Sequence, residues 1–421
     1  NGGKVIVLLN NSNPMEIEEI KENPGVDAIM QIGFPGGYGF LGIADILSGA
    51  AVPSGHLADT YATDNSVAPS AMNYGNFEYT NADEDNCINS ALVEAENIYI
   101  GYKYYETRYM DCILQQGNAS SEVGSFDGKA WKYENEVSYP FGYGLSYTEF
   151  EHQLDSLSVD VENKKVTASV TVKNTGDVAG KDAVQLYVSL PYTEYDKEHG
   201  IEKAGVQLLD YAKTAEIAPG ESQTITIEAD MQYMTSWDAS CDNAAGTKGC
   251  YILDAGTYYF TLGNDAHDAA ENVLSAMGAD VEKKDSDAVT ASWELEELDS
   301  ETFAHSKNGT PVENQLQDMD LNYWMPDTVT YLTRNDWEGT FPKTYRDLTA
   351  TEEMLENMDN DIYEISDSGE PSKVIFGENN GVSLADMKGV EDLEDPRWET
   401  LMNQLSLEEA MIRVALGGVS T

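Results

Sequence analysis

Carboxylates are the most abundant reactive side chains of this sequence, with 75 Asp and Glu against 24 Lys and Arg and five His. Glu94, Glu96 and Glu106 lie close to aromatic residues. Burial against such rings can raise the pKa of a carboxyl group into the range that acid–base catalysis uses. With so many acidic residues, a Glu near a Tyr is expected by chance. We therefore interpret all three as surface or hydrogen-bonded carboxylates.

The His residues give no catalytic or metal-binding pattern. They are scattered along the chain, and no Ser–His–Asp or zinc constellation follows from their spacing. Asp265 and Asp268 flank His267 in GNDAHDAA. These two carboxylates could hold calcium, but a turn that closes a strand is the simpler interpretation. The sequence predicts no metal site and no cofactor.

Loop aromatics are the other candidates for ligand contact. Phe34 and Tyr38 belong to the Gly-rich stretch GFPGGYGF, which matches neither dinucleotide nor P-loop motifs. They follow the carboxyl end of an expected strand, where open α/β sheets form ligand crevices. Tyr192 and Tyr195 lie in the long loop PYTEYDKEHGIEK. Packing is the competing interpretation for each of the four.

The elements that would position these residues begin with an α/β pattern in residues 1–150. Short apolar runs suit buried strands, and helix-like segments separate them, which implies a parallel sheet with helical cover. The strands are expected at 4–10, 26–33 and 56–61, and the helices at 14–23 and 41–49. Residues 62–150 are polar and Tyr-rich, and we expect an irregular packed region there.

Residues 151–278 change to alternating apolar and polar positions with Gly and Pro turns, which predicts an antiparallel β-sandwich. Residues 279–373 are expected to be a linker or irregular segment, in which 280–299 indicate a charged linker or solvated helix. A short helix is expected at 348–357, begun by Thr349 or Thr351. Residues 374–421 end in an amphipathic helix pair, with Ser406 as a cap.

The net charge of −51 argues against nucleic acid or anionic membrane as partners, because phosphate groups require Lys and Arg. A neutral ligand such as a sugar is compatible with that surface. Cys241 and Cys250 flank a Gly-containing loop, so a disulfide is an open alternative to two free thiols. Cys87 and Cys112 are interpreted as buried thiols. A cytoplasmic or cell-associated location is favoured over secretion, with the compartment left open.

Several long motifs then occur in one order. They are VDAIMQIGFPGGYGFLGIADILSGAAVPSGHLADTY, IYIGYKYYETRY with YPFGYGLSYTEF, and VTVKNTGDVAGKDAVQLYVSLPY with APGES and YILDAGTYYFTLGNDAHD. This series resembles the α/β sandwich and fibronectin type III-like domains of glycoside hydrolase family 3, densely over residues 1–278. The last 48 residues or so resemble the segment that leads into the catalytic (β/α) barrel in members where the barrel follows these domains.

The resemblance implies part of a retaining β-glycosidase that hydrolyses terminal β-linked glucose, with a partial α/β sandwich at 1–150, a fibronectin-like sandwich at 151–278 and the start of a barrel at 374–421. Its implied partners are a β-linked oligosaccharide and the barrel of the same enzyme, with a homo-oligomer as an option. The family's nucleophilic Asp and its acid/base Glu are expected outside this sequence, so no residue here is assigned a catalytic role.

Two other functions stay open. One is β-xyloside cleavage or dual specificity. The other, of a different class, is a non-catalytic carbohydrate-binding or interaction module. Phe34, Tyr38, Tyr192 and Tyr195 are the candidates for contact at the substrate rim.

Overall fold

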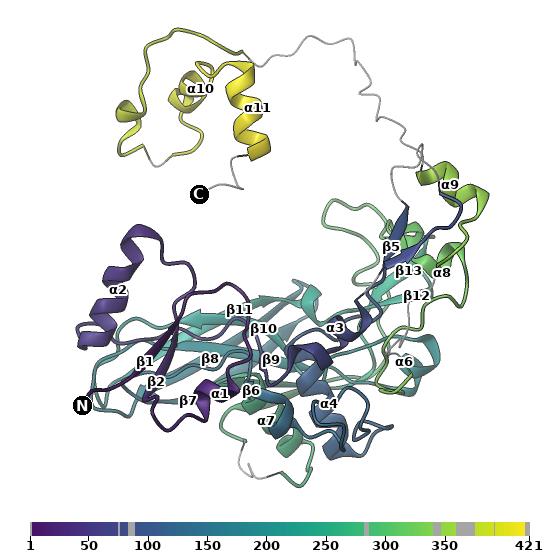
Figure 1. Ribbon diagram of the computed structural model, residues 1–421, viewed down its shortest axis with the longest axis horizontal. Coiled ribbons are helices and arrows are strands. Elements are labelled where there is room, and N and C mark those ends of the chain that lie inside the picture. The colour runs from purple at the N-terminus through teal and green to yellow at the C-terminus, as the bar shows by residue number, and fades with distance from the viewer. Residues whose placement is uncertain are drawn as a thin grey trace. The chain divides into compact units, whose positions relative to one another are not determined.

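The computed structural model describes residues 2–74, 76–82, 89–281, 286–339, 347–358, 375–390 and 392–416. The chain divides into two compact units, Asn1–Asp359 and Asn360–Thr421, which are described separately. Figure 1 shows the order of the elements along the chain. Within the described residues, no helix is both long enough and apolar enough to span a membrane.

The first unit begins with two short parallel strands, β1 (Ile6–Leu9) and β2 (Ala28–Gln31). Between them lies one helical turn, α1 (Glu18–Lys21), shorter than the predicted helix, and after them comes α2 (Gly36–Ser48). Gly49 ends α2 in the left-handed conformation, with φ of 78°, as the sequence predicts. A small core forms on one side of the pair, with Leu9, Ile17 and Tyr61 buried.

The predicted third strand at residues 56–61 is wrong. The observed strand β3 is Tyr61–Ala62, and it pairs antiparallel with β6 (Val137–Tyr139). Leu57 also exchanges backbone hydrogen bonds with the 142–143 turn, and the His56 ring bonds to the Gly142 carbonyl at 2.6 Å. The segment therefore satisfies its backbone against a part of the chain some 80 residues later, which local patterning does not reveal.

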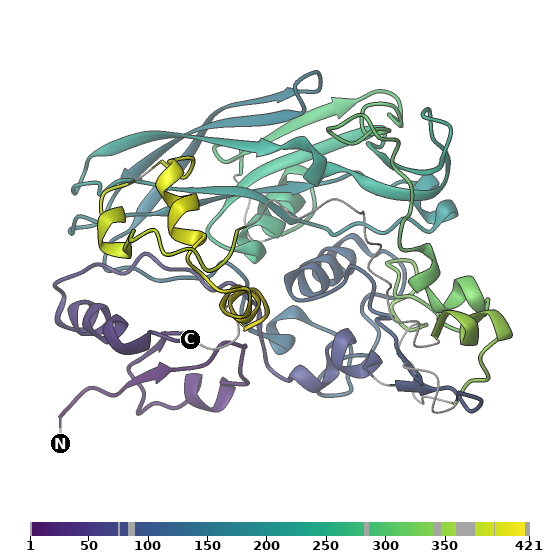
Figure 2. The same cartoon turned by 90° about the horizontal axis from the view of Figure 1, so that it is seen from above.

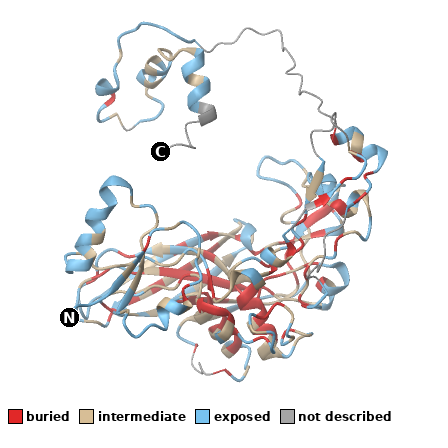
Figure 3. Cartoon of the chain, viewed as in Figure 1, coloured by how far each residue is buried: buried red, intermediate tan, exposed pale blue. Residues whose placement is uncertain are grey.

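The Tyr-rich region contains a regular helix where the sequence indicated irregular packing. This helix, α4 (Tyr102–Leu114), buries polar residues as well as aromatic ones, including Glu106, Arg108 and Asp111. A helix that is covered on most faces shows no single apolar stripe, so its period is hidden in the sequence. Figure 3 shows the contrast between buried α4 and exposed α2. The remaining short elements are α3 (Pro69–Asn73), β4 (Asn76–Glu78), β5 (Ser90–Leu92) and α5 (Tyr133–Glu136).

The expected β-sandwich consists of a three-stranded and a four-stranded antiparallel sheet, with strand orders β11-β8-β7 and β10-β9-β14-β15. Its strands are β7 (Phe150–Asp160), β8 (Lys165–Asn174), β9 (Ala183–Ser189), β10 (Gln207–Lys213), β11 (Ser222–Asp230), β14 (Gly256–Gly263) and β15 (Thr290–Leu295). Fully buried Val170, Leu186 and Phe260 belong to the core between the sheets. Figure 2 shows these strands gathered as one layered body beside α4.

Strand β15 corrects the prediction of a linker or solvated helix at residues 280–299. It pairs along its whole length with β14, and Trp293 packs on Tyr258 with ring centroids 5.0 Å apart. The exposed acidic residues Glu294 in the strand and Glu296 and Glu297 directly after it conceal the alternation. Charged side chains on an edge strand also protect it from pairing with other chains.

The loop between Cys241 and Cys250 is a hairpin turn, as expected, between β12 (Ser236–Asp242) and β13 (Lys248–Ile252). Both cysteines are free thiols, so the disulfide alternative is not realised. Cys250 is buried and lies opposite Asp238 in the pairing register. Asp265 begins a helix, α7 (Ala266–Ala276), by accepting a hydrogen bond from the Asp268 backbone, rather than closing a strand with a turn.

The first unit ends with α8 (Leu321–Trp324) and α9 (Glu352–Met358), with Thr351 as the cap residue at the start of α9. Another short helix, α6 (Glu194–His199), lies in the sandwich loop. The second unit contains α10 (Pro396–Met402) and α11 (Leu407–Leu416). Ser406 and Glu409 exchange hydrogen bonds at the start of α11, which confirms the predicted cap.

Candidate functional site

Phe34 and Tyr38 are surface residues at the start of α2. Their side chains are 73% and 87% exposed, and no residue of α2 is buried. Gly36 has φ of 59°, which only glycine adopts readily, and this turn allows the helix to begin directly after β2. Both rings are therefore available to a ligand or to another protein surface.

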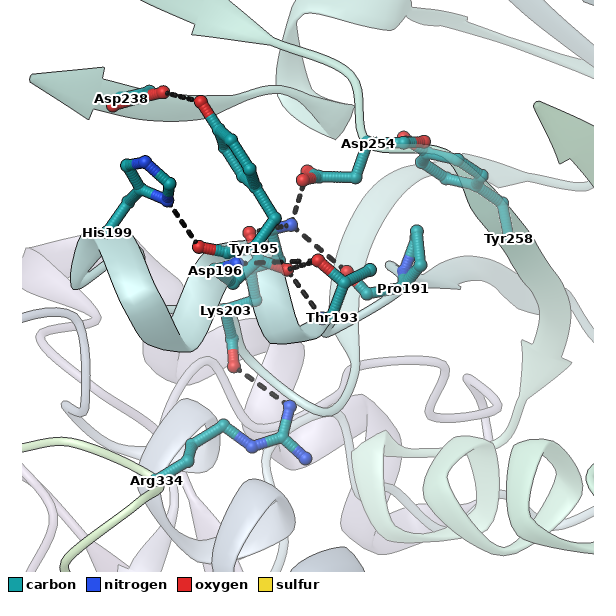
Figure 4. Close-up of polar contacts among 10 residues, drawn as sticks. All are labelled: Pro191, Thr193, Tyr195, Asp196, His199, Lys203, Asp238, Asp254, Tyr258 and Arg334. Carbon is teal, nitrogen blue, oxygen red and sulfur yellow. Dashed lines mark hydrogen bonds and ion pairs between the residues drawn. The ribbon is translucent and has the colours of Figure 1, made fainter. Parts of the chain in front are cut away.

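Tyr195 occupies a different environment, on α6. Its hydroxyl donates a hydrogen bond to Asp238 Oδ2 at 2.6 Å, and its ring stacks on His199 with centroids 4.0 Å apart. Burial and then the Asp238 carboxylate raise the pKa of the Tyr195 hydroxyl. Figure 4 shows the ring extending away from α6 to Asp238. This side chain joins α6 to the hairpin.

Tyr192 is half-buried beside a late segment of the chain. The Arg334 guanidinium lies 4.6 Å from the centre of its ring and the Lys197 ammonium lies 5.8 Å away. Such cation–π contacts stabilise the ring in place. Tyr195 thus lies on α6 and Tyr192 lies just before that helix, while Phe34 and Tyr38 flank the start of α2.

Arg334 is the centre of a buried ion-pair cluster that the sequence did not suggest. Its Nε lies 3.1 Å from Asp111 Oδ2, and the Trp337 indole donates to the same oxygen at 3.2 Å. Burial raises the pKa of the Asp111 carboxyl, and the Arg334 charge opposes that shift. The only signal in the sequence is TRNDW itself, an Arg and a Trp within a chain poor in basic residues.

Glu202 extends this cluster into the sandwich. Its carboxylate accepts hydrogen bonds from the Tyr99 hydroxyl, from Thr333 Oγ1 and from the Arg334 backbone N–H, the last at 3.0 Å. The Lys203 carbonyl accepts from Arg334 Nη1 at 3.3 Å. Residues from α4, from the α6–β10 loop and from the 333–337 segment therefore form one polar core.

From the sequence, Glu106 is predicted to be a surface or hydrogen-bonded carboxylate. In the structure it is completely buried and hydrogen-bonded. It accepts from the Tyr133 hydroxyl at 2.5 Å and contacts His267 Nδ1 at 2.9 Å. The His267 ring stacks on Tyr133, with centroids 3.8 Å apart. Burial lowers the pKa of His267, but the Glu106 hydrogen bond and charge outweigh burial and raise it. This contact joins α4 to α7.

These clusters are suited to holding segments together. Each ionised group in them is paired inside the protein, as buried charges must be. Among the residues that the structure describes, no group of three or more His, Cys, Asp or Glu could hold a metal ion.

Two family models match the parts of the chain that contain most of these residues. Residues 1–147 match the glycosyl hydrolase family 3 C-terminal domain, and residues 182–266 match a fibronectin type III-like domain. Together they confirm the resemblance to glycoside hydrolase family 3 with its fibronectin-like domain.

Curated relatives match the same part of the chain. A β-glucosidase of Ruminococcus albus is 33% identical over 272 residues, which cover 64% of this chain and 24% of the relative. β-Glucosidase A of Butyrivibrio fibrisolvens is 32% identical over 281 residues, which cover 64% of this chain and 29% of the relative. The chain thus spans less than a third of the length of these two relatives.

Solved structures show a partial likeness. A β-glucosidase from Paenibacillus barengoltzii is 26% identical, with a TM-score of 0.49, covering 73% of this chain and 30% of that chain. β-Glucosidase 3B from Thermotoga neapolitana, in complex with α-D-glucose, is 26% identical with a TM-score of 0.47, covering 71% and 32%.

Proposed function

We propose that this chain is the accessory part of a retaining β-glycosidase, a β-glucosidase that releases terminal β-linked glucose from oligosaccharides. Its two matched domains support the proposal, as do the β-glucosidase relatives. A retaining enzyme needs a nucleophilic carboxylate and an acid/base carboxyl about 5–5.5 Å apart. In this proposal, both groups come from protein beyond these residues, and the catalytic barrel is the principal partner of the chain.

The observation that carries the proposal is the uncovered apolar surface of the first elements. Val5, Ile6 and Leu8 on or beside β1 are 39–48% exposed, and Phe40 and Leu41 on α2 are 55% and 67% exposed. A two-stranded parallel sheet is normally covered on both faces. We propose that these elements belong to a larger α/β sandwich, in which further strands and the barrel cover this surface.

The second unit supports the same arrangement by itself. Leu407, Met411 and Ile412 on α11 are between 50% and 62% exposed, and Leu384 and Leu393 before α10 are 72% and 81% exposed. An amphipathic helix with its apolar face in water needs a neighbour. We propose that residues 374–421 begin the barrel and that this face packs against it.

The four loop aromatics are our proposed contacts at the substrate rim. Phe34 and Tyr38 have the exposure that stacking on a sugar ring requires. Tyr192 and Tyr195 would contact the sugar while they keep their existing contacts with Arg334 and Asp238.

The proposal is tested with the complete translation product that contains these residues. We expect it to hydrolyse an aryl β-glucoside with retention of anomeric configuration, followed by proton NMR, and an aryl β-xyloside more slowly. Faster cleavage of the xyloside would replace β-glucosidase by β-xylosidase. Binding of cello-oligosaccharides without hydrolysis of either substrate would contradict an enzymatic role and indicate a binding module.

A further inference from the structure

The side-chain amine of Lys203 is buried in the protein beside two carboxyl groups. Its side chain is 1% exposed, and its Nζ contacts Asp196 Oδ1 at 2.6 Å and the carboxyl of Asp254. The side chains of Asp196 and Asp254 are 0% and 3% exposed. Figure 4 shows the Lys203 nitrogen pointing between the two carboxyl groups, below Tyr195. We infer that Lys203 Nζ and Asp254 Cγ join in an intramolecular amide, an isopeptide bond.

Asp254 has the properties of the electrophile. Its Oδ2 faces Lys203, whereas its Oδ1 is buried without a hydrogen-bond partner within the described structure. A buried carboxylate oxygen without a partner is costly, and the cost falls when the group is protonated. Burial raises the pKa of Asp254 to about 6, with the Lys203 charge opposing and the nearby Asp196 charge adding to the shift. The neutral acid is therefore accessible near physiological pH.

Asp196 is placed to move protons. Its Oδ2 accepts hydrogen bonds from the Thr193 backbone N–H at 2.6 Å and from Thr193 Oγ1 at 3.0 Å. These bonds form the cap of α6 and fix the carboxylate, so that Oδ1 is directed at Lys203. A fixed carboxylate beside an amine and a carboxyl group can accept a proton from one and return it to the other.

The reaction balances without a co-reactant. A proton passes from the Lys203 ammonium to Asp254, which gives a neutral amine and a neutral carboxylic acid. The Nζ lone pair attacks Cγ and the Nζ–Cγ bond forms, while Asp196 takes a proton from Nζ. Asp196 returns that proton to the hydroxyl on Cγ, the Cγ–O bond breaks and water leaves. The cluster carries one net negative charge before and after the reaction, because Asp196 ends ionised.

The surroundings favour condensation over an ordinary ion pair in two respects. Water has little access to the three buried groups, which opposes hydrolysis of the product. The Pro191 carbonyl accepts from Lys203 Nζ at 3.0 Å, and the Tyr258 hydroxyl donates to the Asp254 backbone carbonyl at 3.0 Å, so both partners are held in place. Holding two reacting groups in contact raises their effective concentration greatly.

The bond would fasten two distant parts of the sandwich. Lys203 precedes β10, and Asp254 lies 51 residues later, just before β14. A covalent link over that separation restricts the unfolded chain in the way that a disulfide does. It would do so without the oxidising compartment that a disulfide requires.

Peptide mass mapping of the complete translation product that contains these residues tests the inference directly. After native incubation, denaturation and trypsin digestion, we expect the peptide that contains Lys203 to be joined to the peptide that contains Asp254. The mass of the joined product should equal the sum of the two separate peptide masses minus one water. Trypsin should fail to cut after Lys203. Two separate peptides, with full cleavage after Lys203, would show that the cluster is an ion pair only and overturn the inference.

Three variants make the result specific. Asp196→Asn keeps both reacting groups but removes the proton acceptor, so we expect the joined peptide to fall at least tenfold. Asp254→Asn should lose ammonia instead of water when it joins Lys203. Lys197→Gln, at an exposed position of α6, should leave the joined peptide at the wild-type level. Undiminished joining in Asp196→Asn would overturn the reaction as assigned, and circular dichroism checks that each variant is folded.

Discussion

The Arg334 guanidinium makes a two-point contact with the Asp111 carboxylate, with Nε 3.2 Å and 3.1 Å from its two oxygens. The two residues are 223 positions apart, and both are buried. This pair fastens the segment after α8 to α4 of the family 3 domain. It is central to how the chain keeps its two matched domains and its later segment in one unit.

Replacing Arg334 by Met should destabilise the first unit by about 3–5 kcal/mol, because the Asp111 charge is left buried without its partner. Urea unfolding followed by tryptophan fluorescence measures this change, since Trp337 lies in the same cluster. Asp111→Asn combined with Arg334→Met should recover part of the loss, as a double-mutant cycle would show.

An exposed ion pair provides the control. Lys129 and Asp127 are 2.6 Å apart, but the Lys129 side chain is 77% exposed. Lys129→Met should leave the unfolding midpoint unchanged within error. Equal effects of the Lys129 and Arg334 substitutions would contradict the importance given to burial.

Glu136 should make stability depend on pH. Burial raises its pKa from 4.5 to about 7, although hydrogen bonds from the Phe126 backbone and the Arg108 charge oppose the shift. The folded protein therefore holds this proton more tightly than the unfolded chain. Its contribution is fully present below about pH 4.5 and is lost as pH rises through 7.

Glu136→Gln removes this titration. As pH rises from 4.5 to 8, the unfolding free energy of the wild type should fall relative to that of the variant by about 3 kcal/mol. Denaturant unfolding at a series of pH values measures it. A difference that stays constant with pH would mean that Glu136 is ionised normally in the folded protein.

Substitution of the aromatic candidates should affect either substrate binding or stability, depending on whether the ring is exposed. Tyr38→Ala should leave stability unchanged, because the ring is 87% exposed, and should raise KM for cello-oligosaccharides in the complete enzyme. Tyr195→Phe should lower stability by about 1.5–3 kcal/mol, since it removes a hydrogen bond to a carboxylate. If Tyr38→Ala changes neither KM nor kcat, the proposed rim contact is wrong.

The thiols should differ in reactivity. Burial raises the pKa of Cys250 and of Cys112 to about 11 in each case, so their reactive thiolate forms are scarce at neutral pH. Among these three described thiols, partly buried Cys241 should be alkylated before buried Cys250 in the native protein. Peptide mapping after brief alkylation identifies the order.

Much of this fold can be predicted from the sequence because its signals are local. The alternation around Val170 and Phe260 predicts sandwich strands, and Gly49 marks the end of α2. The family resemblance rests on motifs of the same kind. Helix α4 and strand β15 were missed because burial of polar residues in one, and acidic neighbours around the other, hide the period.

The polar clusters could not be predicted for a different reason. Arg334, Asp111 and Glu202 come from three separated segments, and nothing in their local sequence says that they meet. The same holds for Glu106 with His267, which the sequence alone leaves as two ordinary residues. Their pairing depends on tertiary packing, so only the structure can reveal it.

The central proposal is that this chain supports a β-glycosidase whose reacting carboxylates lie in other parts of the protein. The most direct measurement traps the covalent glycosyl-enzyme of the complete translation product with a fluorinated glucoside and locates the label by peptide mapping. We predict a labelled aspartate outside the 421 residues described above. A label on any carboxylate within them, or hydrolysis by the isolated 421-residue chain at the rate of the complete product, would contradict the account.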